Sequence, residues 1–257
     1  MNNSPIGIYD SGFGGLSVWR ELYRALPDES LIYLGDGKNC PYGSLPSHQI
    51  ERFAIEAVEH LLERGCKMIV VACNTATAAA IATLRKRFSH IPIVGLEPAV
   101  KPACKLSKSG RVAVLATESS LRSEKFRHTM KLYSGDVEVV PVVGRGFVEA
   151  VEASQEQSEA TRLLVANVIE PVIEQGVDVI VLGCTHYPFL RSVMRDVVGN
   201  RNVAIIDSGE AVGKRVQSLL ERYDIRAEEE HEPSYEFLTF ADEDYRERLR
   251  MKAFGEE

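Results

Sequence analysis

Short runs of apolar residues alternate with longer amphipathic stretches along this chain. Runs such as IGIYD at 6–10 and RVAVLA at 111–116 are typical of buried strands, because they are short, rich in β-branched residues and bounded by polar residues or glycine. The stretches between them place apolar residues at i, i+3, i+4 and i+7, which indicates helices with one buried face. Strands that alternate with helices predict parallel sheets covered by helices on both faces.

The same pattern gives approximate bounds for the elements. We expect strands at 6–10, 30–34, 68–72, 91–95, 111–116, 137–143, 177–183, 202–207 and 235–240. Helices are expected after the first strand as far as Leu26, from Ser47 with this serine as N-cap, and over about 75–88 and 119–133. A further helix covers 164–173, where Pro171 could introduce a kink, and two more helices flank the last strand.

Two segments of the chain repeat each other. Residues 65–75 read GCKMIVVACNT and residues 176–186 read GVDVIVLGCTH, so that in each a glycine ends a helix and a cysteine follows a β-branched run. Residues just past the carboxyl end of a strand face the ligand crevice in open α/β sheets. The repeat therefore predicts Cys73 and Cys184 at equivalent strand ends of two similar halves, on two sides of one small molecule.

This organisation predicts an α/β fold of two similar doubly wound domains with mainly parallel sheets. We expect the first domain to comprise residues 1–97 plus 208–257 and the second to comprise residues 98–207. The active-site cleft is expected between the two domains.

Composition excludes several classes of protein. The 257 residues are 45% hydrophobic and 26% charged, which is typical of a soluble globular protein. A net charge of −7 without a basic stripe argues against a nucleic-acid or membrane partner. The most apolar stretch, 68–84, is interrupted by Asn74 and three threonines, so we interpret it as a strand followed by a helix.

The cysteines and the first residues of the chain bear on its location. Five cysteines without a CxxC spacing indicate neither a disulfide framework nor a zinc ribbon. The opening MNNSPIGIYD lacks the basic and apolar regions of a signal peptide. Free thiols in such a chain predict a cytoplasmic protein. We interpret Cys66 and Cys104 as inert apolar residues and Cys40 as incidental.

Polar motifs follow the expected strands. DSGFGGLS at 10–17 places glycines at 12, 14 and 15, which does not fit the dinucleotide-binding pattern. The loop would hold Asp10 and Ser11 at a strand end with free backbone N–H groups for an anion, although a purely structural turn capped by Asp10 is the alternative. In PYG at 41–43, Gly43 would let the backbone approach a ligand.

Each of the two repeated cysteines is followed by polar residues. Asn74 and Thr75 come directly after Cys73, and Thr185 and His186 come directly after Cys184. Both pairs are expected at the start of a helix, where the helix dipole and unpaired N–H groups favour a carboxylate.

The motifs DSGFGG, PYG, ACNTA, GLEPA and LGCTHYP, in this order, resemble those of the glutamate racemases in the aspartate/glutamate racemase superfamily. The resemblance covers essentially the whole chain. It implies an isomerase that interconverts L- and D-glutamate without cofactor or metal and supplies D-glutamate for peptidoglycan synthesis, and thus for cell wall biogenesis and cell shape. It also implies a cytoplasmic homodimer with glutamate as its small-molecule partner.

The resemblance also implies roles for individual residues. Cys73 and Cys184 would be the two acid/base residues, with Asp10 assisting Cys73 and His186 together with a glutamate assisting Cys184. Glu149 is the expected glutamate, with Glu152 as the alternative because the segment PVVGRGFVEA contains one extra residue. The implied substrate contacts are Asp10, Ser11, Tyr42, Gly43, Asn74, Thr75, Thr117, Thr185 and His186, and Ser120 stands where a second threonine is usual.

Two cysteines suit this chemistry, because inverting a stereocentre without a cofactor needs a base on one face of Cα and an acid on the other.

Other classes of protein remain as alternatives. A pyridoxal-phosphate racemase would need a lysine at a strand end, where the motifs have none. A zinc enzyme could use Cys73, Cys184 and His186, and a two-lobed binding module would need no paired thiols. A racemase of aspartate or another amino acid is the nearest alternative enzyme.

Overall fold

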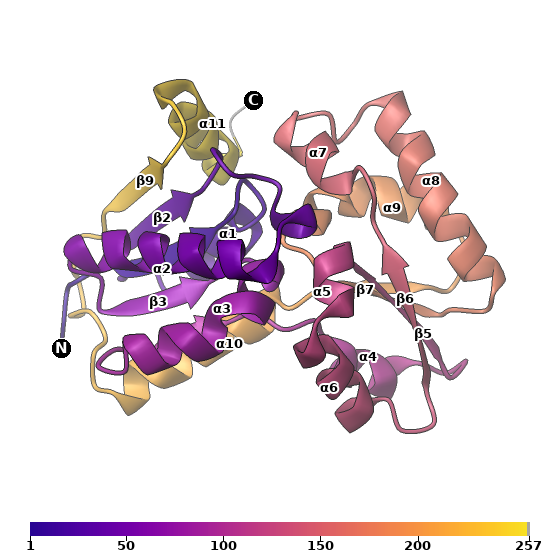
Figure 1. The fold of residues 1–257 in the computed structure, drawn as a ribbon, viewed down its shortest axis with the longest axis horizontal. Coiled ribbons are helices and arrows are strands. Elements are labelled where there is room, and N and C mark those ends of the chain that lie inside the picture. Colours follow the sequence, from indigo (N-terminus) through magenta and orange to yellow (C-terminus); the bar gives the residue numbers. More distant parts are fainter. Residues whose placement is uncertain (256–257) are drawn as a thin grey trace. The chain divides into compact units, whose positions relative to one another are not determined.

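The computed structural model describes residues 1–255, and these fall into two compact units. One unit comprises Met1–Leu96 and Gly209–Glu257, and the other comprises Glu97–Ser208. The chain thus begins one unit, builds the other without interruption and then returns to the first (Figure 1). All strand pairs in the described residues are parallel, so the predicted α/β class is confirmed.

The first unit is built on a five-stranded sheet in the order β4-β3-β1-β2-β9. Its strands are β1 (Ile6–Asp10), β2 (Leu31–Gly35), β3 (Met68–Val71), β4 (Ile93–Gly95) and β9 (Tyr235–Thr239). Its helices are α1 (Leu16–Ala25), the short 3₁₀ helix η1 (Tyr42–Ser44), α2 (Ser47–Glu63), α3 (Asn74–Arg87), α10 (Gly209–Arg222) and α11 (Glu243–Phe254).

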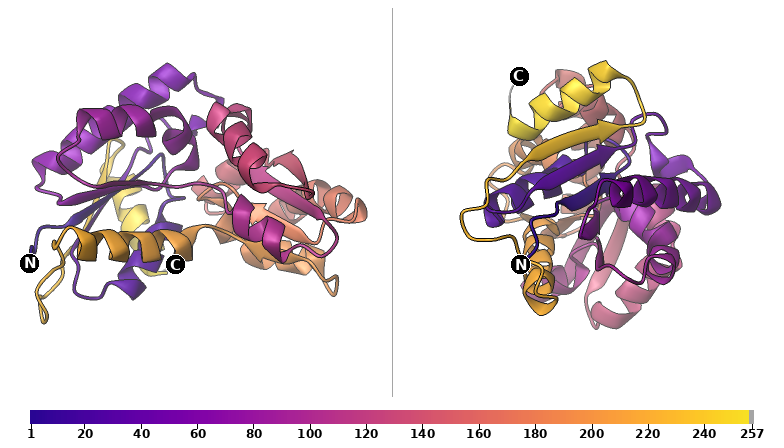
Figure 2. Two further views of the ribbon diagram at one scale, coloured as in Figure 1. Left: turned by 90° about the horizontal axis from the view of Figure 1, so that it is seen from below. Right: turned by 90° about the vertical axis from the view of Figure 1, so that its left-hand side faces the viewer.

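Helices cover both faces of this sheet, which is why its strands are apolar at consecutive positions. Helices α2 and α3 pack on one face (Figure 2). Tyr9 and Val71 belong to the buried cluster of this unit. Helices α1 and α11 pack together on the other face. There Trp19 lies against the rings of Phe237 on β9 and Phe254 on α11.

The second unit is built on a four-stranded sheet in the order β6-β5-β7-β8. Its strands are β5 (Arg111–Ala116), β6 (Glu138–Val143), β7 (Val179–Leu182) and β8 (Ala204–Ile206). Its helices are α4 (Val100–Leu106), α5 (Glu118–Arg122), α6 (Glu124–Tyr133), α7 (Phe147–Glu152), α8 (Glu159–Glu174), the 3₁₀ helix η2 (Tyr187–Leu190) and α9 (Arg191–Val198). Helices α4 and α6 cover one face of the sheet, and α8 and α9 pack together on the other (Figure 1).

The two glycines that open the repeated segments have the same conformation. Gly65 follows α2 with φ +79°, and Gly176 follows α8 with φ +85°. Glycine adopts this left-handed conformation without strain, and it ends a helix by satisfying its last carbonyl groups. The repeat therefore reflects a shared helix–glycine–strand unit that leads to each cysteine.

Two details differ from the pattern-based expectations. The expected helix at 119–133 is two helices, because Ser123 adopts extended backbone (φ −65°, ψ 147°) and its hydroxyl accepts a hydrogen bond from the N–H of Phe126. Pro46, not Ser47, occupies the N-cap of α2. Helix α8 includes Pro171 and ends at Glu174, so a helix is present at this position as expected.

Among the residues described here, no helix combines the length and apolarity needed to cross a membrane.

Candidate active site

The carboxyl ends of β1 and β3 bring Asp10, Ser11 and Cys73 to one edge of the first sheet, because the two strands are neighbours and parallel. Cys73 is the N-cap of α3, and its sulfur accepts a hydrogen bond from the N–H of Ala76 at 3.4 Å. Its thiol also lies 3.6 Å from Oγ of Ser11, to which it donates. A helix N-terminus and a backbone N–H both favour the thiolate form of a cysteine.

The glycine loop after β1 fits closely around Asp10. The carboxylate of Asp10 is fully buried and accepts a hydrogen bond from the N–H of Gly12 at 2.9 Å. A Cβ at Gly15 would lie 2.5 Å from the Cβ of Asp10, so only glycine fits there. Asp10 does not cap α1, because the N-cap of that helix is Gly15. Its carboxylate instead holds the glycine loop, on the same sheet edge as Cys73.

Tyr42 belongs to a buried hydrogen-bond chain in the same unit. Its hydroxyl donates to Oδ2 of Asp36 at 2.5 Å, and the hydroxyl of Tyr9 therefore donates to Tyr42 at 2.7 Å. Burial, the neighbouring Tyr9 and Asp36 raise the pKa of Tyr42 far above its usual range. Tyr9 and Asp36 belong to none of the sequence motifs, because no motif marks a side chain that contacts only a neighbouring side chain.

In the second unit, Cys184 lies just past the end of β7. Gly183 precedes it, and its N–H donates to the carbonyl of Leu115 on β5 at 2.7 Å. A Cβ at Gly183 would lie 2.9 Å from that carbonyl oxygen. Glycine thus lets the chain turn directly off the sheet and places Cys184 at its edge.

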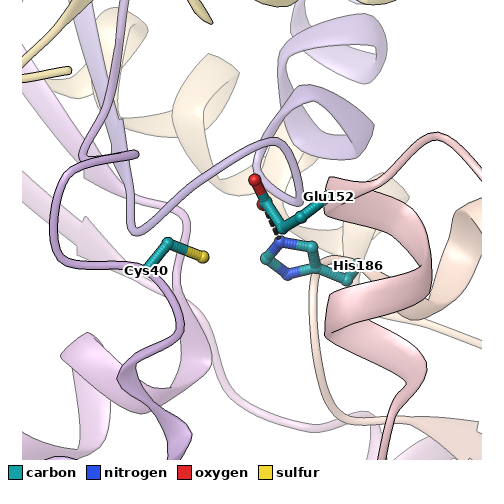
Figure 3. A group of neighbouring side chains, drawn as sticks. All are labelled: Cys40, Glu152 and His186. Carbon is teal, nitrogen blue, oxygen red and sulfur yellow. Dashed lines mark hydrogen bonds and ion pairs between the residues drawn. The ribbon is translucent and has the colours of Figure 1, made fainter.

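His186 links Cys184 to a glutamate. Its Nδ1 lies 3.8 Å from the sulfur of Cys184. Its Nε2 lies 2.6 Å from Oε1 of Glu152, at the end of α7 (Figure 3). Glu152 accepts from Nε2, which leaves Nδ1 facing the thiol. The glutamate in contact with His186 is thus Glu152, the alternative, whereas Glu149 lies one helical turn earlier and acts electrostatically on Tyr187. Cys40, drawn in the same view, belongs to the first unit.

The two cysteines differ in their local structure. A helix of 14 residues begins directly after Cys73. After Cys184 the chain forms the short helix η2, and α9 begins only at Arg191. The expected start of an α-helix at Thr185 and His186 is therefore wrong. The polar group next to the sulfur of Cys184 is the His186 side chain, whereas the sulfur of Cys73 lies at a helix N-terminus.

The remaining expected substrate residues lie at strand ends or in adjoining turns. Thr117 is the N-cap of α5. Its hydroxyl accepts a hydrogen bond from the N–H of Ser120 at 3.2 Å and donates one to the Oγ of Ser120 at 2.9 Å. The others are Gly43 in η1, Asn74 and Thr75 in the first turn of α3, and Thr185 between the cysteine and the histidine.

Comparison with known proteins identifies the family. The sequence profile of the Asp/Glu/hydantoin racemases matches residues 14–215. This chain belongs to the Asp/Glu/hydantoin racemase family. It is an isomerase, as the resemblance of its motifs to the racemases implied.

Individual members of the family are similar over nearly the whole chain. A glutamate racemase of Herpetosiphon aurantiacus is 46% identical over 251 residues, which is 98% of each chain. The crystal structure of a glutamate racemase from Bacillus anthracis superimposes with a TM-score of 0.87 at 31% identity, over 100% of this chain and 96% of that one. A glutamate racemase from Francisella tularensis in complex with D-glutamate gives 0.85 at 26% identity, with the same coverage.

Proposed function

We propose that this protein is a glutamate racemase that interconverts L- and D-glutamate by proton transfer between Cα and two cysteines, without a cofactor. The observation that carries the proposal is the matched pair of thiols at strand ends, each held by groups that assist proton transfer. The high identity to named glutamate racemases, and the D-glutamate bound in the Francisella tularensis enzyme, support glutamate as the substrate.

The proposed reaction needs one thiolate and one thiol at a time. An unperturbed thiol has a pKa of about 8.5, so only a minority is ionised at neutral pH. At Cys73, the N-terminus of α3 and the N–H of Ala76 favour the thiolate. At Cys184, Nδ1 of His186 accepts the thiol proton while Glu152 stabilises the resulting imidazolium. The thiolate then removes the Cα proton, and the other thiol protonates the opposite face.

Substrate binding in this proposal uses backbone and hydroxyl donors. The first N–H groups of α3, at Asn74 and Thr75, are suited to a substrate carboxylate. Fixed donors of this kind also stabilise the negative charge that develops when Cα loses its proton. Ser11, Tyr42, Gly43, Thr117 and Thr185 complete the proposed contacts, with Asp10 assisting Cys73.

Cys73→Ser and Cys184→Ser test the two-base scheme. Each should lower racemisation of both enantiomers by about 10²-fold or more, the contribution typical of an acid/base residue. Optical rotation follows racemisation, and proton–deuterium exchange at Cα follows each half-reaction. Cys104→Ser is the matched control, because this half-buried cysteine of the second unit lies outside the proposed site. Near-normal turnover of both enantiomers by Cys184→Ser would refute the scheme.

The biological context is part of the same proposal. A cytoplasmic homodimer that supplies D-glutamate for peptidoglycan should restore growth of a bacterium that requires added D-glutamate, and should elute as a dimer in size-exclusion chromatography. Assays with aspartate beside glutamate distinguish the proposed substrate from that of the nearest alternative racemase. Faster racemisation of aspartate would overturn the choice of substrate.

A further inference from the structure

Tyr187 connects two segments of the second unit. It directly follows His186 and is fully buried at the start of η2. Its backbone N–H donates to the carbonyl of Cys184 at 3.1 Å, which closes the turn that carries the cysteine and the histidine. Its side-chain hydroxyl donates to the carbonyl of Gly144 at 3.2 Å, in the connection between β6 and α7.

The contact with this connection is tight. The carbonyl of Gly144 also accepts the N–H of Phe147, the first residue of α7, at 3.3 Å. The rings of Phe147 and Tyr187 meet edge to face, with centroids 5.2 Å apart. A Cβ at Gly144 would lie 2.6 Å from the hydroxyl oxygen of Tyr187, so the tyrosine packs directly against the start of α7.

The other end of α7 carries Glu152, which accepts the hydrogen bond from His186. We infer that Tyr187 is a positioning residue for proton transfer: it fixes α7 against the turn of Cys184 and His186, so that Glu152 orients His186 toward the thiol. This inference rests on the proposed function and extends it to a residue outside the substrate contacts.

Tyr187 does not itself exchange protons. Burial raises its pKa well above the usual range, and the negative charges of Cys184 and Glu149 raise it further. The hydroxyl therefore stays protonated and is a permanent donor to Gly144. Within this unit, the titratable side chains near Cys184 are His186, Glu149, Glu152 and Tyr187. Of these, Tyr187 keeps its proton.

Tyr187→Phe tests the inference, because it removes the hydroxyl and keeps the ring. Two measurements report on it: the rate at which iodoacetamide alkylates each cysteine near neutral pH, resolved by peptide mass spectrometry, and the Cα-deuterium isotope effect for each enantiomer of glutamate. Tyr33→Phe is the matched control, since Tyr33 is also buried and its hydroxyl donates to the carbonyl of Gly12 in the first unit at 2.6 Å.

In Tyr187→Phe we expect alkylation of Cys184 to slow about fivefold, the factor that corresponds to one neutral hydrogen bond, while Cys73 keeps its rate. The isotope effect should increase only for the enantiomer whose proton Cys184 removes, with KM unchanged. Tyr33→Phe should leave alkylation of Cys184 unchanged.

Unchanged alkylation of Cys184 in Tyr187→Phe, or an equal decrease at both cysteines, would overturn the positioning role. The alkylation measurement needs no substrate. A failure of glutamate racemisation in the unmodified protein would therefore refute the proposed function while the positioning role could still be tested.

Discussion

Glu149 and Glu152 stand one helical turn apart on α7, and only the second contacts His186. Residues three apart on a helix share a face, so the sequence pattern could not distinguish them. The distinction depends on where α7 ends relative to the turn after Cys184. That relation comes from tertiary contacts such as the one between Tyr187 and Gly144.

The two glutamates should therefore differ in their effect on the reaction. A hydrogen bond to a charged group is worth about 1.5–3 kcal/mol, so Glu152→Gln, which weakens it, should lower kcat about tenfold. Glu149→Gln should change kcat by less than about twofold, because this side chain acts only through its charge. Steady-state kinetics in both directions measure the difference. A larger loss in Glu149→Gln would show that the carboxylate of Glu149 assists the reaction directly.

A second residue-scale consequence concerns Cys66, which lies in the buried cluster beneath α2. Burial, with a smaller effect of Glu236, raises the pKa of this thiol from 9.0 to about 12. The folded protein therefore keeps the proton at a pH where the unfolded chain loses it. This contribution to the free energy of unfolding is complete below pH 9 and is lost as the pH rises toward 12.

Cys66→Ala should remove this dependence. Urea unfolding between pH 8 and pH 11 should show a steeper loss of stability for the unmodified protein than for Cys66→Ala, although the variant starts lower because of the cavity it leaves. The other ionisable groups are the same in both proteins and cancel in the comparison. Parallel curves would mean that Cys66 ionises equally in the folded and unfolded states.

At the scale of elements, the regular pattern predicted most of the fold, and the exceptions have local causes. Hydrophobic periodicity located the strands, because burial on both faces of a parallel sheet leaves a continuous apolar run. It did not separate α5 from α6, since the break at Ser123 depends on a hydroxyl that caps the second helix. It located α8, which includes Pro171 and ends at Glu174.

The candidate site shows the same limit. The repeat of glycine, strand and cysteine could be recognised because Gly65 and Gly176 share a backbone conformation that only glycine adopts easily. The segments after the cysteines look alike in sequence, but one begins a long α-helix and the other a 3₁₀ helix. Pro188 lies inside that shorter helix, whereas the residues after Cys73 are mostly alanine and threonine.

At the scale of the whole molecule, one buried ion pair joins segments that are distant in sequence. Nζ of Lys67 lies 2.6 Å from Oε2 of Glu29, and both side chains are almost fully buried. Lys67 also donates to the carbonyl of Asn2, and Oε1 of Glu29 accepts the N–H of Ala227 at 2.8 Å. The pair thus connects four segments: the residues that precede β1, those that precede β2, those that precede β3, and the segment that leads to β9.

Lys67→Met should leave the carboxylate of Glu29 buried and unpaired, which costs about 3–5 kcal/mol. The double variant Lys67→Met, Glu29→Leu should regain most of this loss, because it removes both charges. Chemical denaturation of the two variants and the unmodified protein gives the comparison. Equal stability of the single and double variants would show that the unpaired charge is not the cause.

Strand β9 has a consequence for how the protein is made. It completes the edge of the first sheet beside β2, yet its residues are synthesised after the entire second unit. Residues 97–208 can fold while the ribosome is still translating the chain. Until β9 and α11 are synthesised, the edge of β2 stays unpaired and Trp19 lacks its contacts with Phe237 and Phe254. Residues 1–96 are therefore synthesised before the second unit, yet their sheet is completed only after it.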